Sequence, residues 1–131
     1  MGLKLTLKPG ERIAINGAVV TNGERRSSVV IENQARILRE GDIMQPEEAK
    51  TPASRIYLPI MMMYLEPETR TKCHSEFANR LTEFLEVVIE NKCHEKCLSI
   101  AAHVANEDYY KALAECRYLM NYEKERLNHV A

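Results

Sequence analysis

The stretch Leu3-Lys4-Leu5-Thr6-Leu7-Lys8-Pro9-Gly10 decides how the first half of this chain folds. Apolar and polar residues alternate strictly in it, so the three leucines share one face, and Lys4, Thr6 and Lys8 share the other. This period of two residues is typical of a strand that buries one face in a core. Pro9-Gly10 then predicts a turn. The chain is therefore expected to begin with a half-buried strand.

Short apolar runs separated by turn residues continue as far as residue 40. The runs are Ile13 with Ile15, then 18–21, 29–31 and 35–39, and turn residues stand between them at 16–17, 22–23 and 32–34. Asn22-Gly23 predicts a tight type I′ hairpin, because both central residues of that turn need a positive φ. Residues 3–40 are thus predicted to form an antiparallel β-meander of about five short strands.

The composition changes after this region. Residues 41–54 contain acidic, small and proline residues, which predict a loop or a brief helical turn and make this stretch the linker between two parts. Residues 55–65 form the most apolar stretch and show no alternation, which indicates a strand buried on both faces or a segment wedged between the two halves. Pro59 argues against a central strand. Met61-Met62-Met63 is expected to pack in the core rather than to form an adaptable binding surface.

Three apolar stripes with helical spacing occupy the rest of the chain. They are Phe77, Leu81, Phe84, Leu85 and Val88; Cys93, Cys97, Ile100, Ala101 and Val104; and Tyr109, Leu113, Cys116, Met120 and Leu127. Each stripe places apolar side chains on one helix face. The first helix is expected to begin near Pro67 or Glu68, and Asn106 is a good N-cap for the third. The predicted fold is α+β, with a β-rich part over 1–65 and a three-helix bundle over 66–131.

Composition and charge limit the class of protein. With 131 residues, of which 45% are hydrophobic and 28% charged, the chain is expected to fold into a globular structure. Its formal charge is −1, but residues 1–60 carry nine Lys and Arg against seven Asp and Glu, and residues 61–131 carry nine against twelve. A polyanionic partner of the first part and an ordinary mixed surface both fit this imbalance. No apolar run reaches the roughly 18 residues of a membrane span, so a cytoplasmic protein without membrane contact is expected.

The cysteines could form a metal site, but they could also be free thiols that pack in the core. Cys93-His94-Glu95-Lys96-Cys97 offers soft ligands, with Cys73-His74 upstream. However, Cys93 and Cys97 fall on the apolar stripe of their helix, where cysteine behaves as a small hydrophobic residue, and we expect free thiols with no metal or other cofactor. The sequence has no nucleophile elbow and no glycine-rich phosphate loop, so an enzyme is not expected. A metal-dependent enzyme ranks third among the hypotheses.

Basic residues of the β-rich part are the candidates for nucleic-acid contacts. They are Lys4, Lys8, Arg25, Arg26, Arg36 and Arg39. Arginine can hold phosphate or stack on a splayed base, which is how proteins contact single-stranded RNA loops. The signal is weak by itself, since most soluble sheets have a charged outer face. We nevertheless take an RNA-binding sheet as the first hypothesis.

Several blocks of the chain, in one order, resemble the FlbT family of flagellar biosynthesis repressors. The blocks are residues 3–11, 16–20, 37–40 with 42–44, and 56–65, and Tyr109-Tyr110-Lys111-Ala112-Leu113 fits the family as well. The resemblance implies a post-transcriptional regulator that acts on the 5′ untranslated region of flagellin mRNA and lowers its translation or lifetime. It also implies an opposing helical regulator, FlaF. The family's effect on flagellin is positive in some bacteria, so the sign of regulation stays open.

The β-rich part also resembles, more weakly, the carbon storage regulator family of RNA-binding proteins. The shared pattern is residues 3–11, including Gly10-Glu11, and Leu38-Arg39-Glu40 with Ile43. In that family the first strand and the late arginine form the RNA surface of a dimeric sheet, which implies Leu5, Lys8 and Arg39 as RNA contacts and leaves a homo-oligomer open. Leu7 departs from the pattern, because those regulators tend to be basic there, and they lack a helical half.

The helical half carries the alternative hypothesis. Its acidic balance favours protein contacts, so in this hypothesis residues 66–131 and the methionine segment 61–63 bind FlaF, flagellin or another helical partner. In that case the chain would be an adaptor in flagellar assembly, and any effect on mRNA would be indirect.

Overall fold

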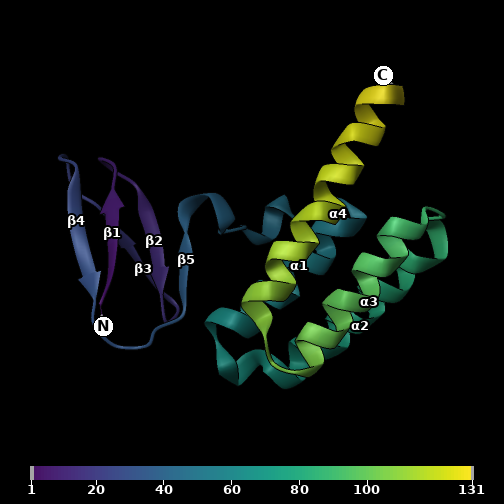
Figure 1. Ribbon diagram of the computed structural model, residues 1–131, viewed down its shortest axis with the longest axis horizontal. Coiled ribbons are helices and arrows are strands. Elements are labelled where there is room, and N and C mark those ends of the chain that lie inside the picture. The colour runs from purple at the N-terminus through teal and green to yellow at the C-terminus, as the bar shows by residue number, and fades with distance from the viewer. Residues whose placement is uncertain (1, 131) are drawn as a thin grey trace. The chain divides into compact units, whose positions relative to one another are not determined.

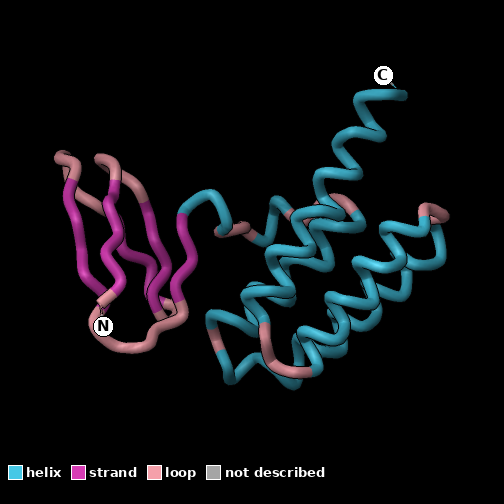
Figure 2. The backbone as a smooth tube through the Cα atoms, in the orientation of Figure 1, coloured by secondary structure: helices cyan, strands magenta, loops and turns pink. Residues whose placement is uncertain are grey.

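The computed structural model describes the backbone of residues 2–130 and the side chains of residues 2–126. The chain divides between Ile43 and Met44 into two compact units. The first unit is built of strands (Figure 1), and the second is built of helices (Figure 2). The predicted α+β class is confirmed.

The described part of the first unit has five antiparallel strands in two small sheets. They are β1 (Leu3–Leu7), β2 (Arg12–Ile15), β3 (Ala18–Thr21), β4 (Ser27–Ile31) and β5 (Ile37–Arg39), and the short 3₁₀ helix η1 (Glu40–Asp42) follows. β1 pairs with β4, and β2 lies between β3 and β5. The predicted number and direction of the strands are confirmed. The order of a simple meander is wrong, because β1 pairs with β4 rather than with β2.

Two Asn-Gly pairs explain this strand order. Asn16 and Gly17 have φ values of 52° and 88°, the positive φ at two successive positions that a type I′ hairpin needs, and they join β2 to β3. Asn22-Gly23 instead begins a longer connection, in which the Asn22 side chain donates hydrogen bonds to the carbonyls of Leu7 and Lys8. The tight hairpin predicted at 22–23 is therefore wrong, and the longer connection leads to a strand that lies beside β1.

The core of the first unit follows from the alternation in β1. Leu5, Leu7 and Ile13 are its buried centre, and partly buried apolar residues pack around them: Ile15, Val29, Ile31 and Ile37. Leu5 lies opposite Val29 in the register of β1 and β4. The polar residues Lys4 and Thr6 are exposed on the other face. The prediction of a strand with one buried face is confirmed.

The described part of the second unit has four α-helices. They are α1 (Pro52–Leu65), α2 (Arg70–Val87), α3 (Asn91–Ala105) and α4 (Tyr109–Val130), with the 3₁₀ helices η2 (Pro46–Glu48) and η3 (Pro67–Thr69). α1 packs against α2 and α4, and α3 packs against α4. The three predicted helices correspond to α2, α3 and α4, and each buries residues of its predicted stripe. Leu127, predicted for the third stripe, lies outside the residues whose side chains are described.

The helix α1 corrects the prediction for residues 55–65. The side chains of Ile56, Ile60 and Met63 are fully buried in it. Thr51 and Ser54 form a capping box and Pro52 stands in the first turn, so the helix has a well-defined start. Because so many of its residues are buried, their sequence shows no single apolar stripe. The absence of a period, which we took as a sign of a strand or a wedged segment, belongs to a buried helix.

This correction changes the domain boundary and the helix count. Residues 44–65 belong to the helical unit, so the boundary predicted after residue 65 lies too late, and the described bundle has four helices rather than three. Met61 and Met63 are buried in α1 and Met62 is half-buried, so the predicted core packing is confirmed for two of the three methionines. Within the described residues, no helix has the length and hydropathy needed to cross a membrane.

Truncation of Ile60 tests the central place of α1. We expect Ile60→Ala to lower the free energy of unfolding by about 2–5 kcal/mol, because it leaves a cavity in a packed core. Leu58→Ala, at a half-buried position of the same helix, is the matched control and should cost less. The measurement is urea unfolding followed by far-UV circular dichroism. Equal, small losses in both variants would contradict the packing described here.

Candidate nucleic-acid interface

Three of the predicted RNA-binding residues gather at one end of the first unit. Leu7 lies opposite Ser27, so Lys8, which follows β1, and Arg25 and Arg26, which precede β4, lie at the same end of this sheet (Figure 1). All three residues are exposed. We call Lys8, Arg25 and Arg26 the basic end.

The side chain of Asn22 holds the backbone of the basic end together. Its Nδ2 lies 2.8 Å from the carbonyl oxygen of Lys8 and 2.9 Å from that of Arg25. Its Oδ1 accepts a hydrogen bond from the Ser27 hydroxyl at 2.7 Å. The backbone amide of Gly10 also donates to the carbonyl of Gly23, at 3.0 Å. The cationic residues therefore stand on two neighbouring connections, one after β1 and one before β4, which several hydrogen bonds fix.

The guanidinium groups of Arg25 and Arg26 are available to a ligand, whereas the Lys8 ammonium also interacts electrostatically with the Glu11 carboxylate. Among the residues whose side chains are described, Lys8, Arg25 and Arg26 make no ion pair, whereas Arg12 pairs with Glu40 at 3.4 Å. The first unit carries seven Lys and Arg against five Asp and Glu, and the second unit carries eleven against fourteen. Exposed cations on a net positive unit attract polyanions.

Arg39 holds strands together rather than standing free. Its Nη2 donates to the carbonyl of Thr6 in β1 at 2.8 Å and to Oε2 of Glu11 at 3.1 Å. Oε1 of Glu11 in turn accepts a hydrogen bond from the backbone amide of Lys8 at 2.9 Å. Arg39 thus links β5 to β1, and Glu11 links the same arginine to the basic end. We interpret Arg39 as a positioning residue for Lys8.

The bonds to Glu11 also shift its titration. The backbone amide of Lys8 and, next, the guanidinium of Arg39 hold the pKa of the Glu11 carboxyl below its ordinary value of 4.5, because they favour the charged form. The carboxylate is therefore charged over the whole neutral range.

The other predicted contacts lie elsewhere in the first unit. Lys4 is exposed on the outer face of β1, opposite Val30. Leu5 is only 9% exposed and belongs to the core. Arg36 lies next to the Asn16-Gly17 turn, where its backbone amide donates to Oδ1 of Asn16 at 2.8 Å. The structure therefore brings Lys8, Arg25 and Arg26 together and leaves these three apart.

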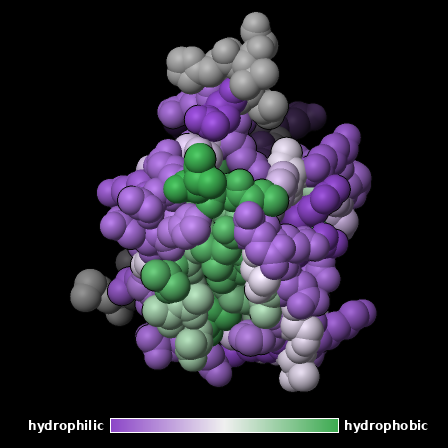
Figure 3. Space-filling view, turned by 90° about the vertical axis from the view of Figure 1, so that its right-hand side faces the viewer, coloured by the Kyte–Doolittle hydropathy of each residue, from purple (hydrophilic) through white to green (hydrophobic). Residues whose placement is uncertain are grey.

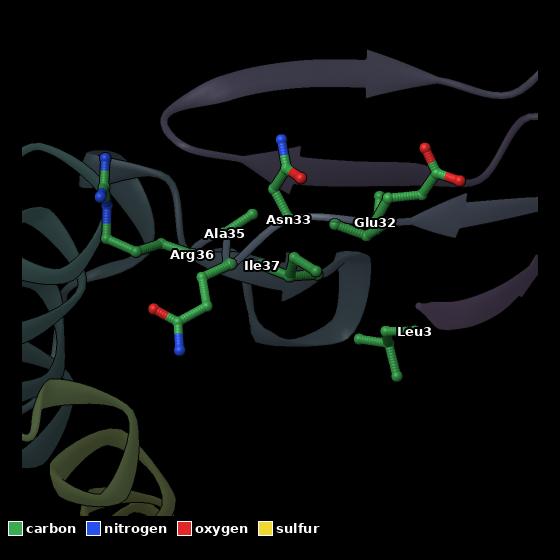
Figure 4. A pocket seen from close by; sticks show the side chains of 8 residues that line it. Leu3, Glu32, Asn33, Ala35, Arg36 and Ile37 are labelled. Atoms are coloured by element: carbon green, nitrogen blue, oxygen red, sulfur yellow. The ribbon is translucent and has the colours of Figure 1, made fainter. Parts of the chain in front are cut away.

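A cavity of about 700 Å³ adjoins the connection between β4 and β5. It is lined by Leu3, Ile31, Glu32, Asn33, Gln34, Ala35, Arg36 and Ile37. Figure 4 shows that the Arg36 side chain extends away from Leu3 and Glu32. The Nε of Arg36 is buried and has no hydrogen-bond partner among the described atoms. Aliphatic walls with amide side chains suit an unstacked base, which needs an apolar contact and hydrogen bonds to its edges.

The cysteines fit a structural role. Cys93, Cys97 and Cys116 are fully buried, and burial raises the pKa of the Cys97 thiol to about 11. A thiol that stays protonated is a poor metal ligand and a weak nucleophile. In the part of the chain that the structure describes, no group of three or more His, Cys, Asp or Glu side chains could hold a metal ion.

Asn22 and Glu11 organise the site, and neither was among the predicted site residues. Asn22 had been assigned to a tight turn, although asparagine also bonds nearby backbone groups in open connections. Glu11 is part of the Gly10-Glu11 pair, but its partner Arg39 is 28 residues away, and spacing along the chain gives no sign of such a contact.

A neutral residue at position 11 should weaken the first unit. The pKa of Glu11 is depressed in the folded state, so its contribution to stability is present above the ordinary pKa and is lost as the pH falls through the lower, folded value. We expect Glu11→Gln to lower the melting temperature at neutral pH and to flatten its decline in acid. Thermal unfolding across the acidic and neutral pH range, with Glu24→Gln as an exposed control, measures this. An unchanged melting temperature in Glu11→Gln at neutral pH would contradict the proposed bridge.

Comparison with known proteins gives the family of the chain. The family profile described as "Flagellar protein FlbT" matches residues 3–127. The whole chain is 52% identical to the flagellum biosynthesis repressor protein FlbT of Caulobacter vibrioides strain CB 15, of which it covers 93%. It is also 52% identical to a probable FlbT of Caulobacter sp. strain K31, with full coverage of both chains. A probable FlbT 1 of Bradyrhizobium diazoefficiens is 36% identical over 95% of this chain and 84% of its own length.

No solved structure matches the chain. The resemblance read from the blocks 3–11, 16–20, 37–44 and 56–65 is confirmed by a match that extends over nearly all residues. The chain belongs to the FlbT family of flagellar proteins.

Proposed function

We propose that this chain represses flagellum biosynthesis after transcription, by binding the 5′ untranslated region of flagellin mRNA through its first unit. Relatives that match along the whole chain are named flagellum biosynthesis repressors, which supports the regulatory role. Binding would lower translation or promote decay of the message in the cytoplasm. The observation that carries the RNA-binding part of the proposal is the basic end, three exposed cations without ion-pair partners on two connections that the Asn22 side chain holds together.

The basic end supplies affinity rather than sequence preference. Arg25 and Arg26 can hold phosphate oxygens in a bidentate manner, and Lys8 adds a compact charge. Such contacts release counterions, so binding should weaken steeply with salt. Selection among sequences then needs contacts to bases, for which the cavity beside Arg36 offers aliphatic and amide side chains.

Arg39 and Leu5 take indirect roles in this proposal. Arg39 fixes the backbone near Lys8 through Glu11, and Leu5 holds β1 in the core. Lys4 and Arg36 stay candidates for further phosphate contacts along the unit.

An adaptor role is the second candidate function. The helical unit exposes the apolar side chains of Val87, Ile89 and Leu98, which favours a protein partner for that unit. In this case the chain would bind FlaF or flagellin, and the mRNA would be affected indirectly. Purified chain that ignores leader RNA but co-elutes with FlaF or flagellin would decide for the adaptor.

Removal of the basic end tests the RNA proposal. We expect a Lys8→Ala, Arg25→Ala, Arg26→Ala variant to bind its flagellin leader RNA about tenfold more weakly or worse. The slope of log affinity against log salt should fall by about 2, since each phosphate contact on a single strand contributes about 0.7. Fluorescence anisotropy at several salt concentrations gives both quantities.

The matched control removes the same charge from the helical unit. A Lys72→Ala, Lys92→Ala, Lys124→Ala variant alters three exposed lysines and should bind RNA like the unchanged chain. If the two triple variants lose affinity equally, the effect is one of net charge, and the assignment of the basic end fails. If the unchanged chain does not bind the leader, the RNA proposal itself fails.

A further inference from the structure

The helical unit contains a groove that the RNA proposal does not use. It has a volume of about 480 Å³ and is lined by Lys50, Thr51, Pro52, Val87, Val88, Ile89, Tyr122, Glu123 and Arg126. These residues come from the start of α1, the connection between α2 and α3, and the later turns of α4. We call this hollow the helical groove.

Apolar side chains at the groove are unusually exposed. Val87 is 70% exposed and Ile89 is 89% exposed, although both are β-branched and strongly apolar. Figure 3 shows hydrophobic residues gathered in a band on one face, with hydrophilic residues on both sides. Apolar surface gathered in a patch with a polar rim marks sites where soluble proteins bind other molecules. The exposure is therefore explained if a partner covers it.

The charges at the groove favour an acidic group on that partner. Among the described side chains, neither Lys50 nor Arg126 has an ion-pair partner, and the Arg126 guanidinium lies 5.7 Å from the centroid of the Tyr122 ring. The carboxylate of Glu123 is engaged, because its Oε2 accepts a hydrogen bond from the backbone amide of Ala53 at 2.8 Å. The groove thus has two cations without ion-pair partners, and its one carboxylate is already hydrogen-bonded.

The groove walls favour a helix over an extended segment. They consist of helices, helix ends and the short connection between α2 and α3, and none of the lining residues belongs to a β-strand. A peptide that binds as an added β-strand needs an open strand edge to pair its amides and carbonyls, and these walls include no strand. A helix satisfies its backbone internally and needs to supply only side chains.

We propose that the helical groove docks an amphipathic helix of a partner protein. The helix inserts large apolar side chains against Val87, Ile89 and Tyr122 and places a carboxylate beside Lys50 and Arg126. This inference does not depend on RNA binding, since it concerns the other unit.

The test is a selection from a displayed library of helical peptides, carried out on the full chain with counter-selection against Ile89→Asp. Ile89 points mainly into solvent, so this variant should fold, which circular dichroism verifies. We expect enriched peptides with large apolar residues at i, i+3 or i+4, and i+7, together with Asp or Glu at one flanking position. The best enriched peptide is then synthesised with a fluorophore, and its dissociation constant is measured by anisotropy.

Three variants locate the peptide. Ile89→Asp should weaken binding about tenfold or more, which corresponds to about 1.4 kcal/mol. Leu98 is 68% exposed on α3 and does not line the groove. The variant Leu98→Asp should therefore leave the dissociation constant within a factor of about two. The double variant Lys50→Glu, Arg126→Glu should bind the acidic peptide more weakly than the unchanged chain does. It should bind more tightly the same peptide with Lys in place of its acidic residue.

Other outcomes would overturn the proposal. Enrichment of peptides without helical spacing, or with Lys and Arg in place of acids, would contradict the chemistry of the partner. Equal losses in Ile89→Asp and Leu98→Asp would place the binding outside the groove. Self-association of the unchanged chain that Ile89→Asp abolishes, with no peptide enriched, would assign the groove to a second copy of the chain.

Discussion

The bridge from Glu11 to Arg39 is the constraint on which the first unit depends. β1 belongs to one sheet, and β2 and β5 belong to the other, so side chains must hold the two small sheets together. The core under them is small, with Leu5, Leu7 and Ile13 at its centre. Arg39 adds a direct link, because it reaches from β5 to the Thr6 carbonyl of β1 while its charge is balanced by Glu11. An ion pair that also satisfies backbone groups is more valuable than an isolated surface pair, which typically contributes about 0–1 kcal/mol.

The same bridge explains why Arg39 has a different role from Arg25 and Arg26, since it is half-buried and they are exposed. The Arg39 guanidinium donates its hydrogen bonds to Thr6 and Glu11. Arg25 and Arg26 stand on a connection fixed by Asn22, and their guanidinium donors stay free for a ligand. A sequence argument treats all of them as basic residues of a sheet. Only the hydrogen-bond partners separate the residues that shape the site from those that can bind a ligand.

Local patterns gave the correct fold wherever one period dominated. The alternation of Leu3, Leu5 and Leu7 predicted β1, and the stripes through Phe77, Cys97 and Leu113 predicted three helices. α1 was missed because a helix buried on several faces shows no period, and Pro59 argued only against a central strand without indicating a helix. The strand order was missed because it rests on contacts such as Asn22 to Leu7, 15 residues apart, which no local rule contains.

The candidate site was predicted only in part for the same reason. The residue types were found, but the grouping of Lys8 with Arg25 follows from the pairing of β1 with β4. The helical groove could not be predicted at all, because it combines three segments that are far apart in the chain. Its one local sign is Val87-Val88-Ile89, three β-branched residues at the end of a helix, where polar residues are more usual.

The two units carry net charges of opposite sign. A net charge near zero hides a positive strand unit and a negative helical unit, so the whole chain would be drawn to RNA only weakly at long range, and the first unit more strongly at short range. A partner helix bound at the groove would change this balance through the charge of the helical unit. If the partner is itself held near the message, it raises the local concentration of the strand unit at the RNA. A basic end with few phosphate contacts would then be enough to keep the RNA bound. If both proposals hold, regulation through such a chain would depend on the joint presence of message and partner rather than on the affinity of either unit alone.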